Sequence, residues 1–298
     1  MRLFHPARRL SAAVLALLSA LVLAAPAFAR AANVRVPTAG EEHYGNSAAS
    51  IDVSNVSQGY LMARYSGSAR RAKLQITGGD KATYTYDLHG GGFEVFPLTA
   101  GSGNYTVNIY ENVAGNQYAL AYGKTIAVQL ENATLPYLYP SQYVRFTAKS
   151  AAVAKGVELA QGAASELEIV SGIYNYVIGH VTYDGDKAAN VKSGYLPDPD
   201  ATLATGRGIC FDYAALMAAM LRSQDIPTRL EVGYVSGGIY HAWITTYITD
   251  VGWINGIIQF DGKSWKLMDP TFASNGGGSP EIMQFIGNGS NYSAKYRY

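Results

Sequence analysis

The hydrophobic pattern changes its period near residue 140, and this change constrains the fold more than any other feature. Between residues 50 and 131, short runs alternate apolar and polar residues and are separated by Gly-rich turns, which is typical of strands. From residue 150 onward, apolar residues recur at helical spacing. A chain of 298 residues is also long enough to bury two cores. The sequence therefore predicts an all-β module followed by a mixed domain of helices and strands.

The all-β module is predicted over residues 49–135, after a polar linker at 30–48. About six short strands without a helical period predict an antiparallel sandwich. The stretch from Leu98 to Tyr105 resembles the tyrosine corner of immunoglobulin-like domains, in which a Tyr bonds back to the preceding turn. The module's many tyrosines form either a binding face or cross-strand core pairs, and the core interpretation is favoured. We expect the module to serve as a spacer or to bind a surface or the substrate.

The first 29 residues have the arrangement of a secretory signal peptide. Arg2, Arg8 and Arg9 precede an apolar run over 10–25, and Ala27-Phe28-Ala29 forms a small-x-small cleavage pattern. A membrane anchor is the alternative, but the run is shorter than the roughly 20 apolar residues that span a bilayer. No later segment is long and apolar enough to span one. The sequence thus predicts a secreted or cell-surface protein without a transmembrane segment after cleavage.

Charge and cysteine content exclude several classes of function. The chain has 23 Lys and Arg residues against 22 Asp and Glu, which argues against a nucleic-acid partner. Cys210 is its one cysteine, so disulfides within the chain and Cys-rich zinc sites are excluded. His43 and His89 stand alone in the all-β module and are interpreted as exposed polar residues. We expect no cofactor and no metal.

Cys210 is predicted to start a helix. It follows Gly206-Arg207-Gly208-Ile209 and precedes an Ala- and Leu-rich stretch that favours helix until Pro227. The first turn of a helix has free N–H groups and the positive end of the helix dipole, which stabilise a thiolate and an oxyanion on a substrate carbonyl. The alternative is a small buried hydrophobe on a core helix.

Two later residues favour the catalytic interpretation of Cys210. His241 opens a predicted strand over 240–248, which pairs with a strand over 228–235 through Ser236-Gly237-Gly238. Asp269 ends a second predicted hairpin, formed by 253–260 and 264–268. A thiol nucleophile needs a base, and the base needs an acceptor that orients it. Cys210, His241 and Asp269 would supply the three roles.

These motifs resemble the transglutaminase-like superfamily. The match consists of Gly208-Ile-Cys210-Phe-Asp-Tyr-Ala, then His241-Ala-Trp243, then Trp265-x-x-x-Asp269-Pro-Thr, over about residues 165–275. The resemblance implies an α+β, papain-like core within residues 140–298, in which a Cys-bearing helix packs on an antiparallel sheet. It also implies that Cys210 is the nucleophile, His241 the general base and acid, and Asp269 the residue that holds the imidazole. Tyr183 and Tyr195 are candidates for a side-chain oxyanion donor.

The expected activity is acyl transfer through a thioester at Cys210 on a protein or peptide amide. Attack by water would make the protein a peptidase or amidase, and attack by an amine would make it a crosslinking enzyme. Asp212 and Arg207 are interpreted as structural partners, Trp243 and Trp265 as residues that pack beside the site, and His180 as structural. The alternative function is an inactive transglutaminase-fold protein that serves in binding or adhesion.

Overall fold

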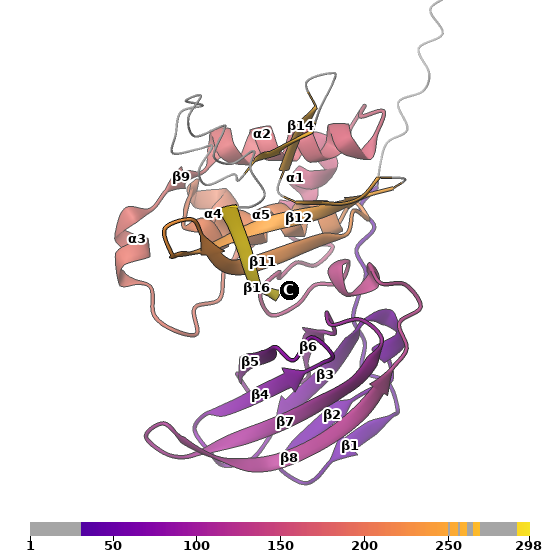
Figure 1. Ribbon diagram of the computed structural model, residues 1–298, viewed down its shortest axis with the longest axis vertical. Coiled ribbons are helices and arrows are strands. Elements are labelled where there is room, and N and C mark those ends of the chain that lie inside the picture. Colours follow the sequence, from indigo (N-terminus) through magenta and orange to yellow (C-terminus); the bar gives the residue numbers. More distant parts are fainter. Residues whose placement is uncertain (1–30, 250, 256, 261–264, 269–290) are drawn as a thin grey trace, which may run out of the picture.

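A computed structural model describes residues 31–249, 251–255, 257–260, 265–268 and 291–298, with the backbone alone at 255, 257–260 and 265–268. An N-terminal unit of strands lies below a unit in which helices and a sheet pack together (Figure 1). The last described strand returns to the lower edge of the second unit, beside the first (Figure 1). None of the described helices is long and apolar enough to cross a membrane.

The N-terminal unit consists of two four-stranded antiparallel sheets. One has the order β1 (His43–Gly45), β2 (Ala49–Asp52), β3 (Tyr60–Tyr65) and β6 (Glu94–Pro97). The other has the order β5 (Thr83–Leu88), β4 (Ala72–Thr77), β7 (Gly103–Ala114) and β8 (Gln117–Val128). Burial alternates along β4 and β5, as their sequence pattern predicts. The segment predicted as a linker contains β1, which pairs with β2.

Tyrosines contribute to the core of this unit. Tyr60, Tyr65, Tyr84 and Tyr86 are buried, so the core interpretation is confirmed for these four. The hydroxyl of Tyr105 donates a 2.7 Å hydrogen bond to the carbonyl of Gly101, which is the bond that the tyrosine-corner pattern predicts.

Two long helices cover the Cys-bearing helix of the second unit. These are α1 (Ala151–Ala160) and α2 (Glu166–His180), and both contact α5 (Cys210–Arg222). Ser165 caps α2, since its hydroxyl accepts a 3.2 Å hydrogen bond from the Glu168 N–H. The Glu168 carboxylate accepts from the Ala164 N–H instead of closing a full capping box on Ser165.

The prolines at 197 and 199 predict a loop in the sequence, and this prediction is wrong in part, because two short helices lie in this region. They are α3 (Gly185–Asn190) and α4 (Pro199–Thr205). Pro199 occupies the first turn of α4, where the missing N–H costs nothing, and Asp198 caps that turn by accepting from the Ala201 N–H at 3.0 Å. A proline in such a position starts a helix and does not mark a loop.

The main sheet of the second unit has the order β13 (Gly252–Asn255), β12 (Ile239–Ile248), β11 (Thr228–Val235) and β16 (Tyr292–Arg297). Its β11–β12 hairpin is confirmed, and α5 packs on both strands. The single strand predicted over 253–260 is wrong. Gly252–Asn255 extends the main sheet beside β12, whereas β14 (Ile257–Phe260) pairs with β15 (Trp265–Met268). A short parallel pair joins β9 (Thr182–Tyr183) to β10 (Arg207–Gly208).

The two units meet at a cluster of aromatic rings. The Tyr143 and Tyr298 ring centroids lie 4.7 Å apart, and Tyr86 of the N-terminal unit stacks on Tyr143 at 5.6 Å. Tyr143 also contacts Phe211, the residue after Cys210, at 5.3 Å. The junction between the units therefore borders the start of α5.

This junction predicts alkaline sensitivity. Burial, and then the charge of Asp87, raise the pKa of Tyr143 to about 12. An unfolded tyrosine has a pKa near 10, so above about pH 10 the unfolded state loses its proton first and gains stability. The melting temperature is expected to fall as pH rises from about 10 to 12, and Tyr143→Phe is expected to make that fall shallower. Melts followed by circular dichroism from pH 8 to 11.5 test this, and a melting temperature independent of pH would contradict it.

Candidate active site

Cys210 is the first residue of α5, as the sequence predicts, and its side chain is partly buried. The turn before it needs glycine. Gly206 ends α4 with φ +60°, and a Cβ at Gly208 would lie 2.7 Å from the Cβ of Asp212. This close approach brings the chain into α5 with the thiol at the free N–H end of the helix.

His241 lies on β12 opposite Gly233 of β11, and only 6% of its surface is exposed. Cys210 and His241 line one cavity of about 480 Å³. The structure thus brings together two residues that are 31 positions apart in the sequence. Asp269, the predicted third member, lies outside the described residues.

Trp243 packs beside His241. It follows His241 by two positions on the same strand, so both side chains point to the same face, and their rings lie 6.4 Å apart at 17°. The indole N–H of Trp243 donates to the buried carboxylate of Glu231 at 2.8 Å. Trp243 is absent from the cavity wall, in agreement with its predicted packing role. Trp265 lies on β15.

Tyrosines form much of the cavity wall. Sequence reasoning named two of them as candidates, and the structure adds three more from distant segments. The five are Tyr143, Tyr183, Tyr195, Tyr240 and Tyr298. Burial raises the pKa of both Tyr183 and Tyr240, and Cys210 adds to the effect, so both phenols stay protonated at neutral pH. No local pattern marks Tyr143 or Tyr298 as part of the site.

The buried carboxylate of Asp212 stabilises the first turn of α5. Its carboxylate is fully buried and accepts from the backbone N–H of Ile209 at 2.8 Å and from the hydroxyl of Tyr195 at 2.5 Å. The Lys187 ammonium on α3 lies 2.7 Å from the same carboxylate. Burial, and then the bond to Asp212, raise the pKa of Tyr195 to about 12. Arg207 forms an exposed ion pair with Asp184 at 3.3 Å. Asp212 and Arg207 therefore both have structural partners, as predicted.

Asp212→Asn is expected to lower the free energy of unfolding by about 3 kcal/mol. Three donors surround the carboxylate, so the amide of Asn would direct its N–H₂ at another donor and leave Lys187 unpaired. Urea unfolding measures the loss. Asp186→Asn serves as the control, because it removes an exposed carboxylate from α3, the helix that bears Lys187. Equal losses in the two variants would contradict the structural role of Asp212.

The other described histidines lie elsewhere. His180 bonds the carbonyl of Leu203 at 2.7 Å and stacks on Tyr176, which fits its predicted structural role. His43 contacts the Gly40 carbonyl, and His89 contacts Glu94. None of these three side chains lines the cavity of Cys210. Within the described part of the chain, no group of three or more His, Cys, Asp or Glu is placed to hold a metal ion.

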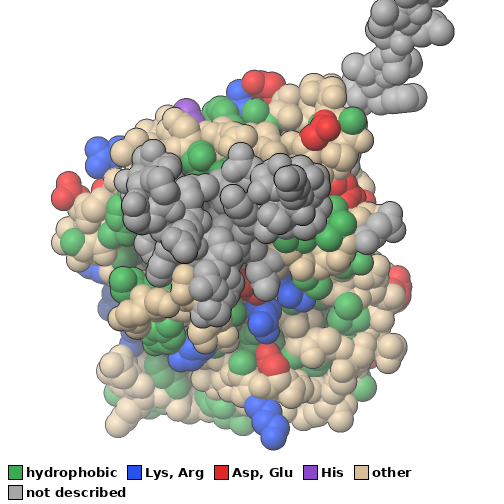
Figure 2. All heavy atoms as spheres, turned by 45° about the horizontal axis from the view of Figure 1, so that its top comes forward, with side chains coloured by type: hydrophobic (Ala, Val, Ile, Leu, Met, Phe, Trp, Pro, Cys, Tyr) green, Lys and Arg blue, Asp and Glu red, His purple; other side chains and the backbone are tan. Residues whose placement is uncertain are grey.

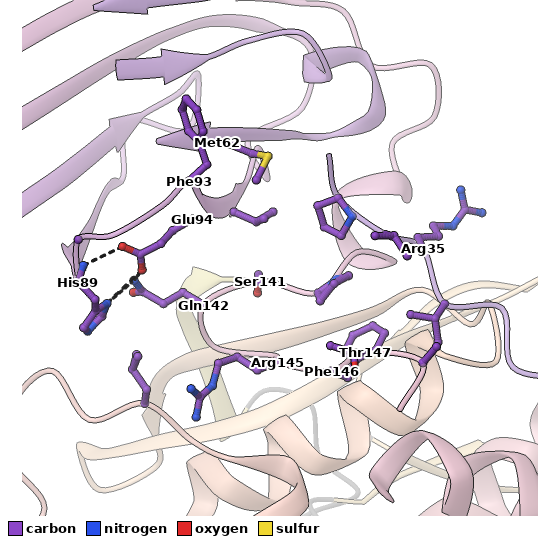
Figure 3. A pocket seen from close by; sticks show the side chains of 18 residues that line it. Arg35, Met62, His89, Phe93, Glu94, Ser141, Gln142, Arg145, Phe146 and Thr147 are labelled. Carbon is purple, nitrogen blue, oxygen red and sulfur yellow. Dashed lines mark hydrogen bonds and ion pairs between the residues drawn. The ribbon is translucent and has the colours of Figure 1, made fainter. Parts of the chain in front are cut away.

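A second cavity of about 650 Å³ lies between the units, and Figure 3 shows it from close by. Glu94, His89 and Gln142 point toward one another on its wall (Figure 3). The Gln142 amide donates to the Glu94 carboxylate at 2.9 Å, and His89 Nδ1 lies 3.0 Å from the same oxygen. These groups satisfy one another, and the cavity contains no thiol. It is therefore not the cavity in which a cysteine nucleophile would act.

Comparison with known proteins agrees with this geometry. Residues 153–256, which include Cys210 and His241, match the pattern of the Transglutaminase-like superfamily. This core belongs to the transglutaminase-like superfamily. Members of that superfamily usually have cysteine-dependent enzymatic activity. The matched residues include α2 to α5 and the β11–β12 hairpin, and the N-terminal sheets lie outside them.

Several other proteins are similar to parts of the chain. A UPF0252 protein of Methanocaldococcus jannaschii is 29% identical over 126 residues, which cover 36% of this chain and 36% of that protein. A candidate cysteine protease from Cytophaga hutchinsonii is 16% identical, with a TM-score of 0.35 over 68% of this chain and 72% of that one. Red sea bream transglutaminase is 13% identical, with a TM-score of 0.27 over 76% of this chain and 53% of that one. These scores are low, so the superfamily match carries the assignment.

Proposed function

We propose that the chain is a cysteine enzyme that acts on protein or peptide amide bonds through a thioester at Cys210. The observation that carries the proposal is the single cavity lined by both Cys210, at the start of α5, and His241, on β12. A thiol at a helix N-terminus beside an imidazole is the arrangement that nucleophilic catalysis by cysteine needs.

The reaction proceeds in two steps. His241 takes the proton of the Cys210 thiol as the sulfur attacks the amide carbon. The C–N bond then breaks as His241 gives this proton to the leaving amine, which leaves a thioester on Cys210. His241 then takes a proton from water or from a primary amine as that group attacks the thioester, and it returns the proton to the sulfur as the C–S bond breaks. The products are a carboxylate or a new amide, together with the free thiol.

Two further groups complete the proposed mechanism. Asp269 accepts a hydrogen bond from the His241 imidazole and fixes its tautomer, a role that rests on the motif Trp265-x-x-x-Asp269. The N–H groups in the first turn of α5 stabilise the oxyanion that forms on the substrate carbonyl. Tyr183, on the cavity wall near the thiol, is the better placed side-chain donor, because the Tyr195 hydroxyl already donates to Asp212.

We also propose that the protein is exported and that its N-terminal unit is an immunoglobulin-like sandwich. Residues 1–29 carry the signal-peptide pattern, and cleavage after Ala29 would release the mature chain. The two antiparallel sheets and the Tyr105–Gly101 hydrogen bond support an immunoglobulin-like unit. Mass spectrometry of the protein secreted by its host would test the cleavage site directly.

The mature protein and its Cys210→Ala variant are to be incubated with casein and a fluorescent primary amine, while labelling and fragment sizes are followed together. Labelling that depends on Cys210 would indicate transamidation, and fragments that depend on Cys210 would indicate a peptidase. Activity that survives the substitution would overturn the thioester mechanism. If neither product appears and the thiol also alkylates slowly, the alternative of an inactive binding or adhesion protein is favoured.

A further inference from the structure

The segment that joins α3 to α4 links the Cys210 cavity to the N-terminal unit. It descends from α3 toward the sheet that contains β4 and β5 (Figure 1). Gly194 has φ +84°, and a Cβ there would lie 3.1 Å from the carboxylate of Asp87 on β5. Ser193 and Gly194 line the cavity of Cys210 and also line another cavity of about 870 Å³. The two cavities therefore share a wall at this segment.

The second of these cavities is rich in positive charge. Its wall contains Arg70, Arg71 and Lys73, with Asp87 as its only acidic side chain among the described residues. Lys73 pairs with Asp87 at 2.6 Å, so these two charges cancel. Arg71 donates to the carbonyl of Gly115, which leaves its charge uncompensated.

Lys192 continues this charge into the Cys210 cavity, which it lines beside Ser193. Among the residues that the structure describes, no carboxylate lies within ion-pair distance of Arg70, Arg71 or Lys192, and all three are exposed. We call the two cavities together, with these three cations, the basic trough. Side chains of both signs are present on the face that Figure 2 shows.

We propose that the basic trough is an extended substrate cleft that selects peptides with acidic side chains near the amide attacked by Cys210. The N-terminal unit supplies Arg70 and Arg71 to this cleft, and the core supplies Lys192 and the thiol. Selection of the reacting amide rests on the function proposed above, whereas binding of the acidic chain does not. Exposed cations without partners attract carboxylates at little desolvation cost.

An acidic peptide fits better than a nucleic acid. Phosphate backbones are held by six to ten or so basic contacts. The trough presents three uncompensated cations and its neighbouring wall is lined by tyrosines, which suit a peptide chain with apolar and acidic side chains. A chain with nearly equal numbers of basic and acidic residues also lacks the charge excess of a nucleic-acid binder.

A binding assay tests the proposal without turnover. The Cys210→Ala protein is titrated into a fluorescein-labelled peptide that contains four Glu residues beside a Gln, and into the matched peptide in which each Glu is replaced by Gln. Anisotropy at low salt is expected to show tighter binding of the Glu peptide. When Arg70→Gln and Arg71→Gln are added to this protein, the Kd for the Glu peptide should rise roughly two- to fivefold for each charge removed.

A matched control removes the same charge elsewhere. Arg64→Gln/Lys149→Gln also deletes two exposed cations, neither of which lines the trough, and its Kd should stay within twofold. The single variant Arg70→Gln tests whether weaker binding comes from lost charge or from misfolding. Within the described residues the Arg70 side chain makes no hydrogen bond or ion pair, so its replacement should leave the fold intact. Equal binding of the two peptides, or equal losses in both double variants, would overturn the proposal. A single-stranded oligonucleotide that binds more tightly than the Glu peptide would also overturn it.

Turnover separates this proposal from the proposed function. With the active protein, kcat/KM for the Glu peptide should exceed that for the Gln peptide, and Arg70→Gln/Arg71→Gln should shrink the difference. Cys210-dependent activity that is equal on the two peptides would support the proposed function and contradict the selection of acidic peptides by the basic trough. Preferential binding of the Glu peptide without any turnover would retain an acidic-peptide site and refute the enzyme.

Discussion

Replacement of His241 by Ala is expected to lower kcat/KM of the Cys210-dependent reaction by about 10²–10⁴-fold, the usual contribution of general acid–base catalysis. The imidazole shares the cavity with the thiol, and no other described histidine lines it. Without the base, the thiol must lose its proton to solvent and the leaving amine must take its proton from water. The pH profile is therefore expected to shift toward alkaline pH, where hydroxide replaces the base.

His180→Ala is the matched control for this substitution. His180 lies on α2, bonds the Leu203 carbonyl and does not line the cavity. The kcat/KM of the His180→Ala protein should therefore stay within about threefold of the original value. Near-ultraviolet circular dichroism establishes that both variants are folded. A His241→Ala protein that is folded and retains more than a tenth of the activity would refute the role of His241 as the base.

Replacement of Arg222 by Met is expected to lower the free energy of unfolding by about 3 kcal/mol. Arg222 is among the largest fully buried side chains of the described residues, and its guanidinium donates to three backbone carbonyls, those of Thr228, Tyr139 and Tyr298, at 2.7–2.9 Å. The Tyr298 carbonyl also accepts from the Leu230 N–H at 2.9 Å, so the substitution orphans the carbonyls of Thr228 and Tyr139, at a cost of about 1–3 kcal/mol each. Burial lowers the pKa of Arg222 to about 9, so the cation itself is costly to bury and its removal offsets part of that loss.

Urea unfolding measures the effect of Arg222→Met, with Arg145→Met as the control. Arg145 is half exposed and lies 3.5 Å from Asp198, so its loss should change stability by no more than about 0.5 kcal/mol. Arg222→Lys should also be destabilised, because an ammonium lacks the planar fork that reaches three separate carbonyls. An Arg222→Met protein as stable as the original would show that the Thr228 and Tyr139 carbonyls find other partners.

The local features of the site were predictable from the sequence. An Ala- and Leu-rich run after Gly206 and Gly208 places a helix start at Cys210, and alternation around Ser236-Gly237-Gly238 places His241 on a strand; both are present. Ser165 as a helix cap and Tyr105 as a corner residue follow from the same kind of short-range chemistry. The predictions that failed were also local. Pro199 starts α4, and the stretch 253–260 divides between two sheets.

The environment of the site was not predictable in this way. Strand β16 pairs with β11 from the far end of the chain, and Tyr298 after it reaches the cavity wall. Arg222 meets carbonyls 83 and 76 positions away. Gly194 meets Asp87 across the two units. No periodicity, turn pattern or motif links residues at such separations.

The sequence by itself therefore determined where α5 begins, which segments form the β11–β12 hairpin, and the residue types that can act as nucleophile and base. These depend on backbone propensity, capping and side-chain period, which act within a few residues. Only the tertiary structure decided which side chains surround the thiol, which charges remain without a partner along the basic trough, and which polar groups are buried. Burial and ion pairing depend on everything that packs nearby, and packing brings together residues from both units of the chain.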